Sequence, residues 1–395
     1  MIFQEGVTCF LMQKPVTPFK YPRFHYTFGF QNMKLMKTTL ATLLFIIPVI
    51  TFAQRTTRSM NGPRGTIGFY QYLPPGYNSN TQLKHPLIIF LHGIGEKGTG
   101  SPEDLKKINC CGIPKYINQG HDMQFTWNGK TEGFVVLYPQ LYSRYGTWEN
   151  YYIDSMIRYA KDSLRIDTNR IFLTGLSLGG GGSWVYPASS IRRGKQLAGI
   201  VPVVSPCFMM NGCNIANSNL PVLAIHAWDD NKASPYCTIN AVKSINDCGA
   251  TIHPNMIIYD NGGHYVWVYR AYDTGYTYFN PNVYEWMLAQ NRNNKPNIKP
   301  VAKAGADITI STSEDEVILD GTASKDPDGK IVRYVWQKVS GPSYDYIAHE
   351  ISPHPVVKGL KYPGVYTYQL RVVDDRAEWS TDSIRITVVD GQVLQ

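Results

Sequence analysis

Residues 170–180, RIFLTGLSLGG, carry the pattern that decides the fold. A short apolar run at 171–174 leads into G-x-S-x-G at 175–179, and the segment from Gly179 to Trp184 can begin a helix. In a strand-to-helix turn of this kind, the glycines leave room for a strained serine, whose Oγ stands at the carboxyl end of the strand. The pattern alone also fits a glycine-rich turn with a helix-capping serine, so its meaning depends on the rest of the chain.

Further apolar segments bounded by turn residues lie on both sides of this one. Most are short and apolar on both faces, as expected of strands buried in a parallel sheet. Helical spacing of Ile153, Met156, Ile157, Ala160 and Leu164 predicts a helix between them, and a second is expected at 281–290. This alternation predicts an α/β fold, a mostly parallel sheet with helices on both faces. The expected strands are residues 68–73, 86–91, 134–138, 170–174, 199–204, 221–227 and 255–259.

The N-terminal segment has the features of an export signal. Residues 33–37 are basic, residues 40–52 are apolar, and small residues end the segment at Ala53, which predicts a secretory signal peptide at 33–53. About 13 apolar residues interrupted by Pro48 fall short of the roughly 20 that a membrane-spanning helix needs. Residues 1–32 precede Met33 and lack periodicity, and we interpret them as an over-extended reading frame. We therefore expect a secreted protein, extracellular or periplasmic.

Cysteine usage fits an oxidising compartment, where an even number of cysteines favours disulfides. The shortest local pairing joins Cys207 to Cys213. It also joins Cys237 to Cys248, which leaves the adjacent Cys110 and Cys111 strained or unbonded. A zinc site is the alternative, but no CxxC pair or matching histidine spacing accompanies the cysteines, and we expect no metal and no cofactor. The six cysteines after residue 53 are Cys110, Cys111, Cys207, Cys213, Cys237 and Cys248.

From residue 300 onward the chain changes character. Short alternating segments such as 308–311, 331–337 and 364–373 are separated by turns like DPDG at 326–329, a pattern typical of an all-β sandwich. Residues 291–300 have the composition of a linker. The expected organisation is an extension (1–32), a signal peptide (33–53), an α/β domain (54–293), a linker (294–300) and an immunoglobulin-like β-domain (301–390).

The charge pattern excludes one class of partner. The net charge of +8 is the sum of +4 from residues 1–53, +8 from a basic region at 54–299, with 23 basic and 15 acidic side chains, and −4 from an acidic region at 300–395, with 10 and 14. Neither region contains a block of lysines and arginines that could follow a phosphate backbone, so we expect no nucleic-acid partner. We expect no membrane association after signal cleavage, and a monomer.

A serine nucleophile needs a base, and the base needs an acid. With a serine in this kind of turn, the acid and the histidine follow it in that order along the chain. Asp229 and Asp230 follow the strand at 221–227, and Asp230 is preferred because a short turn returns it to the site. His264 follows the strand at 255–259 in a glycine-rich loop. We interpret the other histidines of this region as core or surface residues: His85, His121, His226 and His253.

Two backbone N–H groups are needed to stabilise an oxyanion. One is expected from Leu178, directly after Ser177, and the other from Ile94 in the loop HGIGEKG at 92–98. Without a nucleophile nearby, that loop would be an ordinary strand-to-helix connection. Trp148, Trp228 and Trp267 are candidates for stacking against a substrate, although tryptophans are more often core residues.

These motifs together resemble a known family, the secreted α/β-hydrolase esterases often labelled predicted peptidases. These are related to polyhydroxybutyrate-depolymerase-like and feruloyl-esterase-like enzymes. The resemblance covers about residues 64–292 and implies Ser177 as nucleophile, Asp230 as acid and His264 as base. It also implies an oxyanion hole at Ile94 and Leu178. Two positions depart from the family pattern without removing a catalytic group, Ala227 for glycine and Leu178 for methionine. The motifs are LHGIGEKG at 91–98, GLSLGG at 175–180, HAWDD at 226–230, GH at 263–264, Trp267 and AY at 271–272.

The C-terminal region resembles a PKD-type immunoglobulin-like domain. The resemblance is carried by AGAD at 304–307, LDG at 319–321, DPDG at 326–329, YVW at 334–336 and LRVVD at 370–374. Such domains accompany extracellular polymer-degrading enzymes. Asp320, Asp326 and Asp328 could bind calcium, but Asp-Pro-Asp-Gly is more simply a turn.

The expected function is a secreted serine hydrolase of carboxylic esters, with polysaccharide-linked or polymeric esters as substrates. A serine peptidase of the same fold is one alternative, although the sequence contains no β-propeller that could gate its cleft. The other is a non-catalytic glycan-binding protein on the same scaffold, which would use the three tryptophans as stacking platforms. The order of Ser177, Asp230 and His264 along the chain favours the hydrolase.

Overall fold

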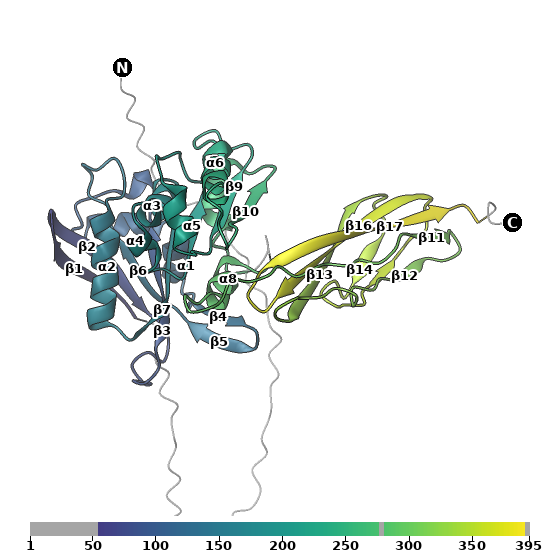
Figure 1. Cartoon of the computed structure of the whole chain (residues 1–395), viewed down its shortest axis with the longest axis horizontal. Coiled ribbons are helices and arrows are strands. Elements are labelled where there is room, and N and C mark those ends of the chain that lie inside the picture. The colour runs from purple at the N-terminus through teal and green to yellow at the C-terminus, as the bar shows by residue number, and fades with distance from the viewer. Residues whose placement is uncertain (1–53, 276–279, 392–395) are drawn as a thin grey trace, which may run out of the picture. The chain divides into compact units, whose positions relative to one another are not determined.

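The computed structural model describes residues 54–275 and 280–391. The predicted extension and signal peptide lie outside these residues. Within the described ranges, no helix combines the length and the apolar character that crossing a bilayer requires. The strand-and-helix part and the all-β part are seen in Figure 1, in purple to green and in yellow-green to yellow.

Eight strands form the main sheet, in the order β1-β2-β6-β3-β7-β8-β9-β10. Strands β6, β3, β7, β8, β9 and β10 are parallel, whereas β1 and β2 add an antiparallel edge. This order is that of the α/β-hydrolase fold, as expected. The strands are β1 (Gln54–Gly62), β2 (Gly65–Leu73), β3 (His85–Leu91), β6 (Val135–Pro139), β7 (Ile166–Leu176), β8 (Gly199–Val203), β9 (Leu223–Ala227) and β10 (Asn255–Tyr259).

Both faces of this sheet are covered. In β3, Leu87 and Ile89 belong to one buried cluster, and Ile88 and Phe90 belong to the other. This alternation explains why the central strands are apolar at every position. Helix α2 (Asn150–Ser163) covers the first face with the predicted apolar stripe, and α8 (Val283–Ala289) covers the second. The other helices are α1 (Gly112–Asn118), α3 (Leu178–Ala188), α4 (Ile191–Gly194), α5 (Gly212–Asn217), α6 (Pro235–Asn246) and α7 (Gly263–Arg270), with 3₁₀ turns η1 (Ile94–Glu96) and η2 (Asp104–Asn109).

Some elements were not predicted from the sequence. Strand β1 pairs with β2 along its whole length but exposes most of its side chains, so it lacks an apolar pattern. The hairpin of β4 (Gln124–Trp127) and β5 (Lys130–Gly133) is likewise short and half-exposed. Its tight turn at Asn128 and Gly129 has positive φ at both positions, a turn geometry favoured in two-residue hairpins.

Two disulfides connect the segment after β8 to the region of α6. Cys207 is bonded to Cys237, and Cys213 is bonded to Cys248. The pairing predicted from chain proximity is therefore wrong. The reason is that α5, which carries Cys213, packs against α6, so the bridges run between elements rather than within one short loop. Cys110 and Cys111 remain thiols.

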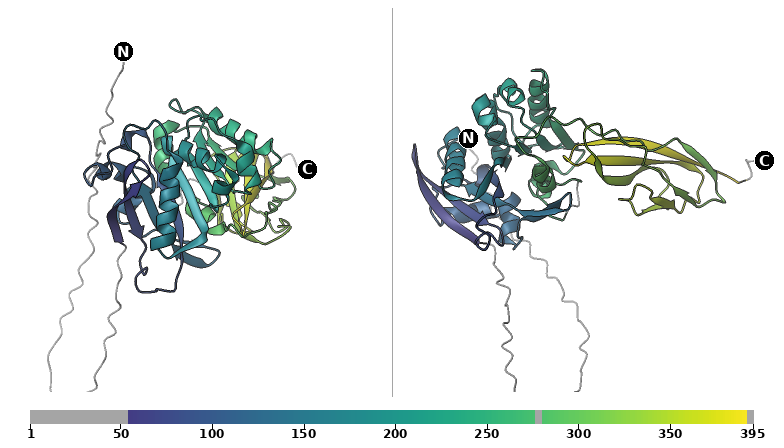
Figure 2. Two further views of the ribbon diagram at one scale, coloured as in Figure 1. Left: turned by 60° about the vertical axis from the view of Figure 1, so that its left-hand side comes forward. Right: turned by 60° about the horizontal axis from the view of Figure 1, so that its bottom comes forward.

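The C-terminal domain is a β-sandwich. One sheet has the order β11-β17-β16-β13 and the other β12-β15-β14. Side chains of both sheets, including Trp336, Leu370 and Val357, enclose one buried core. Figure 2 shows the long strands β16 and β17 in yellow. The strands are β11 (Ile308–Ser311), β12 (Glu316–Ile318), β13 (Ile331–Ser340), β14 (Tyr346–Ala348), β15 (Val356–Lys358), β16 (Gly364–Asp374) and β17 (Trp379–Val389).

Candidate active site

Ser177 occupies a sharp turn between β7 and α3. Its φ of 51° and ψ of −119° are unusual for any residue other than glycine, and its N–H is held by the Val203 carbonyl at 2.9 Å. The glycines on either side are required by space. A Cβ on Gly175 would lie 2.6 Å from the Leu91 oxygen, and a Cβ on Gly179 would lie 2.0 Å from the same atom. The turn thus raises the serine at the carboxyl end of β7, as the sequence predicted.

Asp230 and His264 come together beside β9 and β10. Asp230 lies in the turn after β9, and its Oδ2 is 2.7 Å from His264 Nδ1 near the start of α7. Burial raises the pKa of Asp230, but hydrogen bonds from His226, His264 and the N–H groups of Ala233 and Lys232 outweigh it, and the pKa is far below its usual range. The ionised carboxylate only accepts hydrogen bonds, so the proton of neutral His264 is on Nδ1. Its Nε2 is then available as a base.

Asp229 has a different task from its neighbour. Its carboxylate accepts hydrogen bonds from the N–H of Gly263 at 2.7 Å and of Gly262 at 3.1 Å. Both glycines have positive φ, and a Cβ on Gly262 would lie 2.7 Å from the indole nitrogen of Trp267. The sequence left the two adjacent aspartates as alternatives for the acid that bonds the histidine. In the structure they make different contacts. One bonds the histidine ring, and the other holds the backbone before it.

The loop after β3 is fixed through His92. His92 Nδ1 donates to the Gly93 carbonyl at 2.6 Å, and its Nε2 accepts from the Leu141 N–H at 2.9 Å. Burial lowers the pKa of His92 to about 4, so the ring is neutral at physiological pH. A Cβ on Gly93 would lie 3.6 Å from Ser177 Cβ, which places the loop, and Ile94 after it, directly beside the serine. Leu178 is the first residue of α3, where helical N–H groups lack helical partners.

The three candidate tryptophans differ in exposure. Trp228, which precedes the two aspartates, is 53% exposed and lies 5.7 Å from the exposed ring of Tyr236. Trp148 is 2% exposed and donates its indole N–H to the His92 carbonyl. Trp267 is also 2% exposed, stacks on Tyr259 and donates to the Asn261 carbonyl. Trp148 and Trp267 therefore hold the loops of the site and offer no open face for stacking.

Two supporting residues escaped the sequence analysis in part. His226 was interpreted as a core residue, and it is fully buried. Its Nδ1 is hydrogen-bonded to the Thr238 hydroxyl, and its Nε2 is hydrogen-bonded to the Ala233 carbonyl. It also lies 3.3 Å from Asp230 Oδ2, so it helps to orient the acid. The second residue is Asp229, which accepts hydrogen bonds from the loop before His264. The only sequence signal for this role is the pair Gly262 and Gly263 after β10, whose positive φ values direct two neighbouring N–H groups toward one acceptor.

Comparison with known proteins identifies the second domain. Residues 304–388 match the family described as K319L-like, PKD domain. The C-terminal β-sandwich is a PKD domain. The PKD domain and the α/β-hydrolase domain share polar contacts, among them a bidentate ion pair of Arg333 with Glu285 of α8 and a hydrogen bond from Trp127 to the Asp375 carbonyl.

Two curated proteins are similar over part of their length. A bifunctional acetylxylan esterase/xylanase of Neocallimastix patriciarum is 27% identical over 160 residues, which are 38% of this chain and 20% of that protein. The dyslexia-associated protein KIAA0319-like protein of Mus musculus is 34% identical over 102 residues, or 26% of this chain and 9% of that protein. This chain thus spans a fifth or less of the length of these relatives.

Solved structures are also similar to parts of the chain. A thermostable esterase is 21% identical and covers 60% of this chain and 63% of its own, with a TM-score of 0.46. The PKD domain from the KIAA 1837 protein is 31% identical and covers 25% of this chain and 93% of its own, with a TM-score of 0.22.

Proposed function

We propose that this protein is a secreted serine hydrolase that cleaves carboxylic esters through an acyl-enzyme intermediate. The observation that carries the proposal is the 2.7 Å hydrogen bond between Asp230 and His264, at the same edge of the sheet as the strained turn that holds Ser177. A buried carboxylate that fixes one ring nitrogen leaves the other nitrogen as a base. Ser177 is the nucleophile, His264 the general base and Asp230 the group that orients and stabilises the imidazole.

In the first half-reaction, Ser177 Oγ attacks the ester carbonyl carbon while His264 Nε2 accepts the hydroxyl proton. The carbonyl oxygen becomes an oxyanion, which the N–H groups of Ile94 and Leu178 stabilise. The ionised Asp230 stabilises the imidazolium without taking its proton. The tetrahedral intermediate then expels the alcohol, which receives its proton from His264. An ester between Ser177 and the acyl group remains.

In the second half-reaction, water takes the place of the alcohol. His264 Nε2 accepts a proton from water, the oxygen attacks the acyl carbon, and the same N–H pair stabilises the second oxyanion. Collapse of this intermediate breaks the bond to Ser177 Oγ, and the imidazolium returns the proton to the serine. The products are the carboxylic acid and free enzyme, so no cofactor is consumed.

Polysaccharide-linked or polymeric esters are the substrate class that we propose. The exposed rings of Trp228 and Tyr236 adjoin the turn that carries Asp230, and such rings can stack on a sugar or an aromatic acyl group. Two disulfides suit an oxidising compartment outside the cytoplasm. The similarity to a protein named as an acetylxylan esterase agrees with this choice.

A substrate panel tests the proposal. Purified protein from residue 54 onward would be assayed on p-nitrophenyl acetate and butyrate, methyl ferulate, acetylated xylan and a peptide p-nitroanilide, with Ser177→Ala as the blank. We expect ester turnover that disappears in Ser177→Ala and at most slow peptide cleavage. Faster peptide than ester turnover would assign the site to a peptidase. Glycan binding without any hydrolysis would make the protein a binding module.

A further inference from the structure

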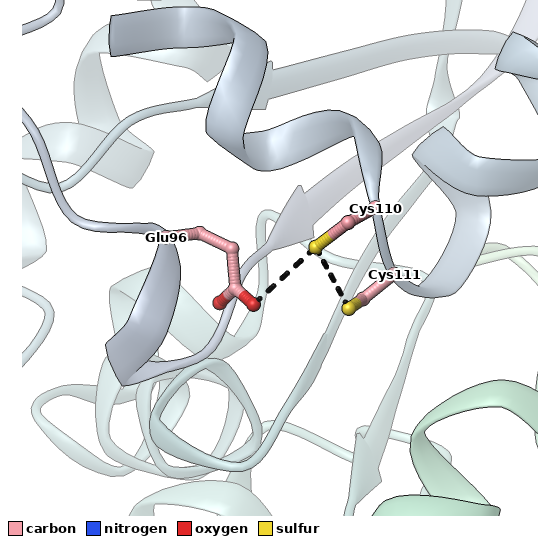
Figure 3. Close-up of side chains that lie close together, drawn as sticks. All are labelled: Glu96, Cys110 and Cys111. Atoms are coloured by element: carbon pink, nitrogen blue, oxygen red, sulfur yellow. Dashed lines mark hydrogen bonds between the residues drawn. The ribbon is translucent and has the colours of Figure 1, made fainter. Parts of the chain in front are cut away.

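A second group of reactive side chains lies next to the candidate active site. Glu96 is the last residue of η1, the short turn that begins with Ile94, and Cys110 and Cys111 join η2 to α1. Figure 3 shows the carboxylate and the two thiols directed toward one another from these segments. Cys110 Sγ is 3.6 Å from Glu96 Oε1 and 2.9 Å from Cys111 Sγ. One ligand atom from each of the three residues can be chosen so that all lie within 4.8 Å of one another.

The carboxylate of Glu96 is mostly buried and lacks a hydrogen-bond partner at one oxygen. Its side chain is 15% exposed, and its Oε2 is buried without a hydrogen-bond partner. An ionised carboxylate in such a place loses hydration that its thiol and backbone N–H donors do not fully replace. Burial accordingly raises the pKa of Glu96. A nearby cation would supply the missing interaction.

Cys110 and Cys111 are poorly placed to form a disulfide with each other. Neighbouring residues joined by a trans peptide have Cα atoms about 3.8 Å apart, whereas disulfides usually require 4.4–6.8 Å. Both disulfides of this protein lie inside that range, at 4.6 and 5.1 Å. A Cys110–Cys111 bond would therefore be strained, which favours the thiol form of both residues.

We propose that Glu96, Cys110 and Cys111 form a binding site for a soft divalent cation of the zinc type. Thiolate and carboxylate ligands suit such an ion, with Zn–S distances of about 2.3 Å and Zn–O distances of about 2.0–2.2 Å. In a tetrahedral site two thiolates lie roughly 3.8 Å apart, so small side-chain rotations would open the present 2.9 Å separation. The three residues leave the fourth position to water. The ion would tie η1 to the junction of η2 and α1.

Cadmium is the probe that tests the site, because cadmium thiolates absorb in the ultraviolet. Metal-free protein from residue 54 onward, with its two disulfides intact and Cys110 and Cys111 as thiols, would be titrated with CdCl₂, and then with ZnCl₂ by calorimetry in two buffers of different ionisation enthalpy. We expect one ion per chain, a thiolate-to-metal absorption band, and proton release on binding. Zinc should also protect both thiols from a thiol-specific reagent and raise the unfolding temperature.

Variants distinguish this site from surface binding. Cys110→Ser with Cys111→Ser should abolish the absorption band, and Glu96→Gln should weaken binding about tenfold or more, a loss of about 1.4 kcal/mol per factor of ten. Glu103→Gln is the matched control, because Glu103 is an exposed acid just before η2. Circular dichroism would confirm that each variant is folded. Equal weakening by Glu103→Gln, or a band that survives loss of both cysteines, would overturn the proposal.

The oxidised alternative is also decided by measurement. Intact mass of the protein as secreted would show two hydrogens fewer per additional disulfide, and peptide mapping would locate it. A Cys110–Cys111 disulfide in that protein would overturn the proposal. The metal titrations need no ester substrate, so their outcome is independent of the proposed hydrolase function.

Discussion

The two domains each bury a carboxylate side chain completely, and they use it differently. Asp230 of the α/β-hydrolase domain bonds the ring of His264. Asp345 of the PKD domain accepts hydrogen bonds from Lys338 and from the Tyr368 hydroxyl. A lysine ammonium has only N–H donors and no acceptor, so the second pair is a fixed structural contact. An imidazole bonded through Nδ1 keeps Nε2 as a second nitrogen that can accept and return a proton, so the first pair can assist a reaction.

The surroundings of these carboxylates differ as well. Asp230 stands at the carboxyl ends of parallel strands, together with a strained serine and two positive-φ glycines. Asp345 lies in the loop between β13 and β14, which belong to different sheets of the sandwich. The comparison teaches that burial of a charge does not mark a reactive site. A reactive site is marked by a partner with a second nitrogen that can accept a proton, and by the backbone geometry around it.

The largest expected effect is the loss of turnover when a residue of the proposed triad in the hydrolase domain is replaced. Ser177→Ala should lower kcat for p-nitrophenyl acetate by roughly four to six orders of magnitude, since only the oxyanion donors and binding remain. His264→Ala should be about as severe. The double variant should be little worse than either, because the residues act as one unit. Multiplying losses would show that the two side chains work separately.

The adjacent aspartates sharpen the comparison within the hydrolase domain. Asp230→Asn should reduce kcat by about three to four orders of magnitude, because an amide can donate to His264 and favour the wrong tautomer. Asp229→Asn keeps an oxygen acceptor for the loop N–H groups and should cost about tenfold or less. Steady-state kinetics on the same ester measure both. If Asp229→Asn were the more damaging, the acid role would pass to that residue.

Asp345→Asn tests the PKD domain's pair. Loss of the carboxylate leaves Lys338 without its ion-pair partner, so the free energy of unfolding should fall by about 2 kcal/mol or more. Turnover per folded molecule should stay at the wild-type value. Urea denaturation and kinetics at a permissive temperature separate the two quantities. A selective loss of turnover would contradict the purely structural role.

His92 gives an effect on stability that appears only on acidification. Its pKa of about 4 in the folded state lies below the 6.5 of an unfolded histidine, so the unfolded chain binds more protons between these values. Stability from this group is complete above pH 6.5 and falls by about 3 kcal/mol on acidification to pH 4. His92→Asn retains a donor for the Gly93 carbonyl. Between pH 4 and 6.5 it should reduce the slope of the free energy of unfolding against pH by the equivalent of about one proton. His253→Asn, at an exposed histidine, is the control, and an equal change there would refute the assignment.

Sequence reasoning reached the fold wherever burial leaves a pattern. The central strands were predicted because both faces of the sheet are covered, and α2 because its apolar stripe follows the helical period. Strand β1 was missed because pairing along an exposed edge requires no apolar residues. The disulfide pairing was missed because it depends on the packing of α5 against α6, which chain distance does not report.

The order of the candidate catalytic residues along the chain could be read from the sequence, but the contacts that hold them in position could not. Ser177, Asp230 and His264 follow the sequence of strand ends, which a one-dimensional pattern records. The uses of Asp229, His226 and Trp148 depend on which backbone atom each side chain reaches, and no spacing encodes that. The cluster of Glu96 with Cys110 and Cys111 was invisible for the same reason, since η2 returns the two cysteines to a residue 14 positions earlier.

The contact of Gly179 with the Leu91 carbonyl has a consequence for motion. The two backbones approach closely there with no room for a side chain, and Leu91 pairs with Gly175 in the parallel sheet, so we expect the turn bearing Ser177 and the strand end leading to Ile94 to move together. Thermal fluctuations should carry the two segments in phase. In hydrogen-exchange experiments their amides should then open as one unit, and far more rarely than those of the exposed edge strand β1.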